Sequence, residues 1–302
     1  LCANSRELEN IEDFVDNYPD AQFLHTMRYT LPSGKRVIAI IGPTASGKSA
    51  LAVRLSRKFN GEVIGADSRQ VYRGLDVGTG KITKKEMYGI PHHLLDVANP
   101  RQQFSVAVYQ KISREKVAEI FSRERLPIIC GGTGLYIDSL LNDTTFPEVP
   151  PNKALRNRLE KKVPEDLFAI LQKLDAKKAK QIDRHNPRRI VRAIEIAMAL
   201  GKVSPLKVQP RREVEPFQIL HIGLTLPPNE LKEKISIRLF ARIRKYKMIQ
   251  EVKLLHKRGL SWKRMEELGL EYRSISRYLR GLLTKEEMLA KLQRQLMRTQ
   301  SP

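Results

Sequence analysis

Residues 37–52 read VIAIIGPTASGKSALA, and this stretch decides the fold. The first five residues form a continuous apolar run rich in β-branched side chains, which is typical of a strand buried on both faces of a parallel sheet. From 48 to 59, apolar side chains recur at helical spacing. Between the two lies G-x-x-x-x-G-K-S, so the order is strand, glycine-rich loop and helix, the context that a phosphate-binding loop requires.

The loop predicts a site for a diphosphate or triphosphate group. Its eight residues are Gly42, Pro43, Thr44, Ala45, Ser46, Gly47, Lys48 and Ser49. Backbone N–H groups of the loop and the helix N-terminus converge on an anion, Lys48 adds a mobile positive charge, and the Ser49 hydroxyl can ligate Mg²⁺.

The loop alone leaves the phosphate-bearing molecule open. A nucleoside triphosphatase normally carries an acidic residue at the end of a later apolar strand, where it organises Mg²⁺ and water. The best later strand here, 127–130, runs into Gly-Gly-Thr instead. The sequence therefore argues against hydrolysis as the main reaction.

The segments around the loop predict an α/β fold, with a P-loop core whose parallel sheet is flanked by helices, plus a small helical insertion domain. Further strands are predicted at 62–66, 127–130 and 219–224, and further helices at 135–141, 187–200, 229–258 and 285–302. A proline-rich stretch, FPEVPPN, precedes a charged helical segment. We therefore expect an N-terminal extension over 1–35, a core over 36–143 and 187–302, and the insertion domain over 144–186.

A polar cluster, Asp67-Ser68-Arg69-Gln70, directly follows the predicted strand 62–66. Ligands of open α/β sheets collect at the carboxyl ends of the strands, so this cluster is expected near the phosphate loop. Asp67 is either a general base or the cap of the next turn. The amide of Gln70 favours the first interpretation, because an amide can pair with an adenine edge through two hydrogen bonds.

The composition favours a polyanionic partner. The chain has 302 residues, with 55 Lys and Arg against 33 Asp and Glu, and a formal net charge of +22. Nucleic acid is the first candidate, and a generally basic surface without a specific partner is the alternative. The acidic N-terminal residues do not resemble a secretory leader, and no apolar run approaches the ~20 residues of a membrane span, so we expect a cytoplasmic protein without membrane contact.

Cysteine and histidine give no sign of a metal centre. Cys2 and Cys130 lie far apart in the chain, which indicates neither a disulfide framework nor a zinc site. His92 and His93 are adjacent, and no carboxylate lies at helical ligand spacing from them, so a turn or structural role is expected.

Six motifs together resemble one family. They are GPTASGKS, DSRQVYRGLDVGTGK, IPHHLLD, PIICGGTGLYIDSLL, RHNPRRIVRAIEI and GLEYRSISRYLRG, in that order. This series resembles the tRNA dimethylallyltransferases, which prenylate the adenine 3′ of the anticodon. The resemblance spans about 37–295 and implies a P-loop α/β core with a helical insertion, dimethylallyl diphosphate and the tRNA anticodon stem-loop as substrates, and Mg²⁺ as cofactor. We also expect a monomer.

The resemblance also implies roles for single residues. Asp67 matches the general base, Thr133 a residue near the reacting base, and Arg238 an arginine that grips the diphosphate; Lys48 and Ser49 match the diphosphate and Mg²⁺ positions. The tRNA-contacting matches are Asp67, Ser68, Arg69, Gln70, Thr133, Arg156, Tyr272 and Arg273. At Glu271 the chain departs from the glycine that is usual in the family.

Other activities remain open at the level of the sequence. An adenylate isopentenyltransferase would prenylate free AMP, ADP or ATP, although a free nucleotide gives no reason for a net charge of +22. A P-loop small-molecule kinase would hold ATP in the loop and use Asp67 to deprotonate a hydroxyl group. A non-catalytic RNA-binding protein could have kept the loop.

Overall fold

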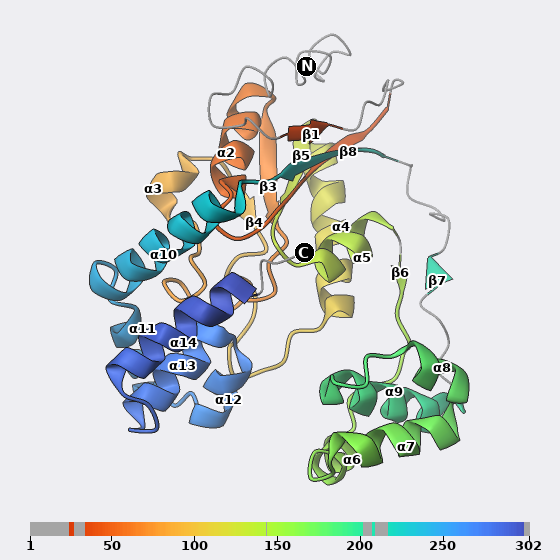
Figure 1. Cartoon of the computed structure of the whole chain (residues 1–302). Coiled ribbons are helices and arrows are strands. Elements are labelled where there is room, and N and C mark those ends of the chain that lie inside the picture. Colours follow the sequence, from red (N-terminus) through yellow and green to blue (C-terminus); the bar gives the residue numbers. More distant parts are fainter. Residues whose placement is uncertain (1–23, 27–33, 143, 202–206, 209–216, 299–302) are drawn as a thin grey trace. The chain divides into compact units, whose positions relative to one another are not determined.

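The computed structural model describes residues 24–26, 34–142, 144–201, 207–208 and 217–298. The chain divides into two compact units, one formed by Leu1–Leu141 with Glu213–Pro302 and the other by Asn142–Arg212 (Figure 1). The expected N-terminal extension, 1–35, lies outside the described residues except for 24–26 and 34–35.

Unit 1 is built on a six-stranded sheet in the order β1-β8-β2-β5-β3-β4. The strands are β1 Leu24–Thr26, β2 Arg36–Ile41, β3 Gly61–Gly65, β4 His92–His93, β5 Leu126–Cys130 and β8 Gln218–Leu224. Neighbouring strands pair in parallel except β1, which lies antiparallel to β8. The predicted α/β fold class with a parallel sheet is confirmed.

Helices cover both faces of this sheet (Figure 1). α2 Lys48–Lys58 packs on one face, and α4 Val106–Ser122 and α5 Gly134–Leu141 pack on the other. The other helices of unit 1 are α3 Lys84–Met87, α10 Pro228–Arg244, α11 Met248–Lys257, α12 Trp262–Glu267, α13 Leu270–Leu279 and α14 Lys285–Arg298. Successive side chains of a strand point to opposite faces of the sheet, so β2 contributes side chains to two hydrophobic cores. Ile38 and Ile40 pack with Leu55 of α2, and Val37 and Ala39 belong to the core that includes α4, α5 and the C-terminal helices.

The predicted helix over 229–258 is wrong in one respect, because it is two helices. α10 ends at Arg244 and α11 begins at Met248, after Lys247 adopts a left-handed backbone with φ of 57°. The break turns the chain so that Met248 and Val252 are fully buried in the core of unit 1. Apolar periodicity on both sides of the break hides it in the sequence.

Unit 2 has its own core. Its elements are β6 Thr144–Thr145, α6 Lys153–Leu159, α7 Pro164–Leu174, α8 Ala176–Gln181, α9 Pro187–Leu200 and β7 Lys207–Val208. Leu167 and Leu171 of α7 pack with Ile190 and Ile194 of α9. The unit thus includes α9, whereas the sequence analysis ended the insertion domain at 186, because the apolar stripe of α9 completes this core.

A buried carboxylate joins α9 to α6 within unit 2. Glu195 is 2% exposed, and its oxygens accept hydrogen bonds from Arg156 at 2.7 and 3.0 Å and from the Asn152 amide at 2.6 Å. Arg192 pairs with the same carboxylate. Arg156, which the resemblance matched to a tRNA contact, therefore uses its guanidinium group inside unit 2.

In the part of the chain that the structure describes, no helix is both long and apolar enough to cross a bilayer.

Candidate active site

The phosphate loop lies between β2 and α2 and leaves the N-terminus of the helix open. Gly47 caps α2 with φ of 92°, and no side chain caps the helix. The first N–H groups of α2 are therefore available to an anion. The hydroxyl of Ser46 is buried and has no hydrogen-bond partner among the described residues, so it too could donate to a bound phosphate.

Lys48 lies across the loop. Its Nζ donates to the carbonyl oxygens of Gly42 at 2.8 Å and Pro43 at 2.6 Å. Burial lowers the pKa of Lys48, and the charge of Arg238 acts in the same direction while that of Asp67 opposes it. A buried ammonium group beside an arginine gains from an arriving anion, which restores the favourable environment of its charged form.

Asp67 follows β3 and caps the turn that carries Arg69 and Gln70. Its Oδ1 accepts from the backbone N–H groups of Arg69 at 2.8 Å and Gln70 at 3.3 Å. The turn-cap interpretation is therefore correct for Oδ1. Among the residues that the structure describes, none donates a hydrogen bond to Oδ2, so the same carboxylate can also take a proton, and the two roles are compatible.

Thr133 is tied to the same turn. Its Oγ1 accepts from the N–H of Ser68 at 2.9 Å, and its own N–H donates to the Ala66 carbonyl at 3.1 Å. Gly131 makes this approach possible, because a Cβ there would lie 2.1 Å from the Ala66 oxygen. The Gly-Gly-Thr end of β5 therefore brings Thr133 against the Asp67 segment.

A pocket of about 170 Å³ is lined by residues of both the phosphate loop and the turn that begins at Asp67. It is lined by Thr44, Ala45, Asp67, Arg69, Gly78, Thr79, Ile235, Arg238, Arg242, Leu268, Glu271 and Tyr272. The structure thus brings the phosphate loop, Asp67 and Arg238 to one cavity. Arg242 and Glu271 line it as well, and neither was predicted as a site residue from the sequence.

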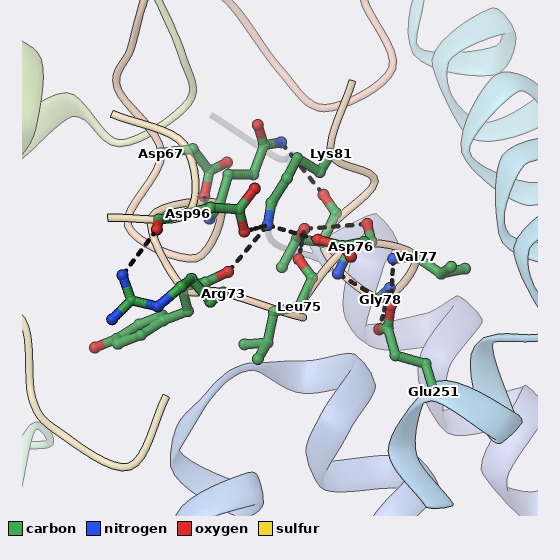
Figure 2. Close-up of polar contacts among 12 residues, drawn as sticks. Asp67, Arg73, Leu75, Asp76, Val77, Gly78, Lys81, Asp96 and Glu251 are labelled. Carbon is green, nitrogen blue, oxygen red and sulfur yellow. Dashed lines mark hydrogen bonds and ion pairs between the residues drawn. The ribbon is translucent and has the colours of Figure 1, made fainter. Parts of the chain in front are cut away.

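One wall of the pocket comes from the loop at 75–81 (Figure 2). The carboxylate of Glu251 accepts hydrogen bonds from the N–H groups of Asp76 at 3.0 Å, Val77 at 2.7 Å and Gly78 at 3.0 Å. At the C-terminal end of the loop, Lys81 forms ion pairs with Asp76 at 2.7 Å and with Asp96 at 2.6 Å. Three consecutive N–H groups form a nest that suits an anion, and a side chain fills it here.

Besides Asp67, Thr133 and Arg156, three more of the predicted tRNA-contacting side chains have internal partners. Gln70 Nε2 donates to the Thr79 carbonyl at 3.4 Å. Tyr272 is buried and its hydroxyl donates to Glu251 at 2.8 Å, while Arg273 Nε donates to the Glu266 carbonyl at 2.9 Å. Burial and the charge of Glu251 raise the pKa of Tyr272, so it stays a donor. Their tRNA contacts remain predictions.

A family comparison decides which kind of enzyme this pocket belongs to. The family model described as IPP transferase matches residues 70–300. The chain belongs to the IPP transferase family. The phosphate loop and Asp67 precede the matched segment, so their assignment depends on the motifs and on the geometry above.

Sequence comparison with known proteins supports the assignment of this chain to the IPP transferase family. A tRNA dimethylallyltransferase of Anoxybacillus flavithermus is 40% identical over 262 residues, which cover 86% of this chain and 83% of that protein. One from Roseiflexus sp. is 41% identical over 260 residues, covering 85% and 84%. The family resemblance predicted from the sequence is confirmed.

Two solved structures have folds similar to that of this chain. The full-length tRNA isopentenylpyrophosphate transferase of Bacillus halodurans superposes with a TM-score of 0.64 at 35% identity, covering 88% of this chain and 84% of that one. A eukaryotic dimethylallyltransferase acting on tRNA gives a TM-score of 0.70 at 24% identity, covering 88% and 68%. The second likeness supports the fold alone.

Proposed function

We propose that this chain is a tRNA dimethylallyltransferase, which transfers the dimethylallyl group of dimethylallyl diphosphate to the exocyclic amine of the adenine 3′ of the anticodon. Relatives of that name are about 40% identical over most of the chain. The observation that carries the proposal is that the phosphate loop, Asp67 and Arg238 line one pocket. A phosphate cradle beside a carboxylate suits a diphosphate that leaves while a nucleophile loses a proton.

The proposed reaction is a substitution at the primary allylic carbon. The adenine N6 forms a bond to that carbon, the carbon–oxygen bond breaks, and its electron pair leaves with the diphosphate. Oδ2 of Asp67 accepts the proton that N6 loses. Lys48, Arg238 and the loop N–H groups stabilise the charge that develops on the leaving diphosphate.

Mg²⁺ fits this site as a partner of the diphosphate. It usually keeps several waters and binds through one or two protein oxygens together with substrate phosphates. Ser49 is an exposed residue at the start of α2, and its hydroxyl is the group that would ligate Mg²⁺. The described residues contain no group of three or more His, Cys, Asp or Glu side chains that would hold a metal by themselves. Bound there, the cation would neutralise diphosphate charge.

The second substrate, tRNA, explains the charge of the chain. A net charge of +22 attracts a polyanion and raises its rate of association. The target adenine has to leave the base stack to enter the pocket, and single-stranded loops make this inexpensive. We further propose that the protein acts as a monomer in the cytoplasm, where tRNA is modified.

The test is an incubation of the purified protein with dimethylallyl diphosphate and Mg²⁺. One sample receives unmodified tRNA, a second receives AMP, and a matched control receives the same tRNA with guanine in place of the adenine 3′ of the anticodon. Nucleoside mass spectrometry should find dimethylallyladenosine only in the first sample.

Each other outcome would indicate a different function for this protein. Product from AMP alone would indicate an adenylate isopentenyltransferase. Phosphorylation of a small molecule by ATP without any allylic diphosphate would indicate a kinase. Normal tRNA binding without product would indicate a non-catalytic RNA-binding protein.

A further inference from the structure

Two arginines one turn apart on α10 face the same pocket. Arg238 and Arg242 are separated by four residues, which places them on one face of the helix. Both line the cavity that also contains Thr44 and Ala45 of the phosphate loop. The family resemblance assigns a role to Arg238 only.

Arg242 is held in place on one side. Its Nη1 donates to the Gly78 carbonyl at 2.9 Å and lies 3.4 Å from Oε1 of Glu271. The residue is only 9% exposed, and its Nε is buried without a hydrogen-bond partner among the described residues. A buried, unpaired guanidinium N–H is costly unless a ligand satisfies it.

The two guanidinium groups lie close together at Gly80. A Cβ on Gly80 would lie 3.0 Å from Nη2 of Arg238 and 3.6 Å from Nη1 of Arg242. Gly80 has φ of 61°, so the backbone also favours glycine at this point. Burial, and next the charge of Arg242, lower the pKa of Arg238. Two cations brought together in a pocket repel one another, and an anion between them relieves that repulsion.

Glu271 offsets part of this positive charge. Its carboxylate pairs with Arg242, and its side chain lines the same pocket. This pairing stabilises the buried arginine. A diphosphate that binds beside Arg242 has to compete with the negative charge of Glu271.

We propose that Arg242 is a second diphosphate-binding arginine of this pocket, and that Glu271 orients it and limits the affinity for the diphosphate. The proposal rests on the proposed function, because it places the diphosphate group in this pocket. It assigns roles to Arg242 and Glu271 in addition to those of Lys48 and Arg238.

A purely structural role makes a different prediction for Glu271. If Arg242 only joins Gly78 to α13, then loss of either member of the pair would loosen the pocket and weaken anion binding. If Arg242 binds the diphosphate, loss of Arg242 weakens binding, whereas loss of the negative charge of Glu271 strengthens it. The opposite signs separate the two roles.

The experiment is a calorimetric titration of the full chain with inorganic pyrophosphate in the presence of Mg²⁺. We expect R242Q to bind pyrophosphate about tenfold more weakly than the unmodified chain, and R242K about threefold more weakly, because lysine keeps the charge and loses the planar fork. E271Q should bind about threefold more tightly. R244Q is the matched control, because Arg244 is exposed on the same helix, and its binding should be unchanged.

The outcomes that overturn the inference are specific. Unchanged binding by R242Q, or unchanged or weaker binding by E271Q, would reject it while leaving the proposed function intact. If R242Q does not fold, as judged by circular dichroism, R242K and E271Q still decide. Absence of pyrophosphate binding by the unmodified chain would instead reject the diphosphate site and the proposed function with it.

Discussion

Asp67 uses its two carboxylate oxygens differently, and this permits a clean substitution. Oδ1 accepts two backbone N–H groups, and an asparagine oxygen can accept the same two. D67N should therefore keep the turn while losing the general base. We expect turnover to fall by about 10²- to 10⁴-fold, with tRNA affinity within about threefold of normal. Single-turnover kinetics and a filter-binding assay measure the two quantities.

The control for this substitution is D138N, a change of the same type at an exposed position of α5. Its rate should be normal. A rate for D67N within about threefold of the unmodified enzyme would show that Asp67 only caps the turn.

At this scale the sequence predicts residues that belong to contiguous motifs. The phosphate loop and Asp67 could be placed because each follows a recognisable strand, and Thr133 because it lies in a motif that resembles the family. Arg242 and Glu251 could not, because their partner Gly78 lies more than 160 residues away, and only the fold brings them together. A charged residue on a helix face looks the same in sequence whether it is solvated or lines a pocket.

Glu251 supports one wall of the pocket, because its carboxylate fixes the 75–81 loop to α11. Glutamine at this position keeps one acceptor oxygen and turns an NH₂ group toward backbone N–H donors. We expect E251Q to lower the free energy of unfolding by about 2 kcal/mol. The amides of 76–78 should exchange with solvent at least about tenfold faster, because they lose protection locally. Urea unfolding and hydrogen exchange measure both effects.

E230Q is the matched control, because Glu230 lies exposed in the first turn of α10. It should change neither quantity. Exchange of 76–78 at the normal rate in E251Q would contradict the assigned role and would indicate that Lys81 holds the loop without help from α11.

Elements with a continuous apolar signal were the predictable ones. β2, β3, β5 and β8 agree with the predicted strands to within one residue at each end. α4 was missed, because its burial is confined to a few positions, Tyr109, Ser113, Val117 and Ile120, among many polar residues. α12 and α13 were missed as well, since they are short and pack mainly on other helices.

The two units share one kind of acid-sensitive anchor. In unit 1, Glu62 is 2% exposed and contacts His93 at 2.6 Å, Arg123 at 2.8 Å and Arg125 at 3.1 Å. Glu195 is the corresponding anchor of unit 2. Burial raises the pKa of each carboxyl, but the hydrogen bonds from its basic partners outweigh burial, so both pKa values lie below the ordinary 4.5.

The sign of the pH dependence follows from these lowered pKa values. Each carboxylate contributes stability that is fully present above pH 4.5, the ordinary value, and is lost as the pH falls from there through the lower folded value. Below pH 4.5 the unfolded chain therefore binds more protons than the folded one. We expect the free energy of unfolding to fall steeply in that range.

The single tryptophan allows the two anchors to be separated. Trp262 lies on α12 of unit 1, so its fluorescence reports the unfolding of that unit, whereas far-ultraviolet circular dichroism reports both. E62Q should lose about 2 kcal/mol at pH 7 and show a shallower acid slope by fluorescence, because a neutral side chain no longer releases a proton on folding. E195Q should flatten the acid slope of the dichroism signal and leave that of the fluorescence unchanged. An acid slope by fluorescence that is equal in E62Q and the unmodified chain would show that other carboxylates control the acid stability of unit 1.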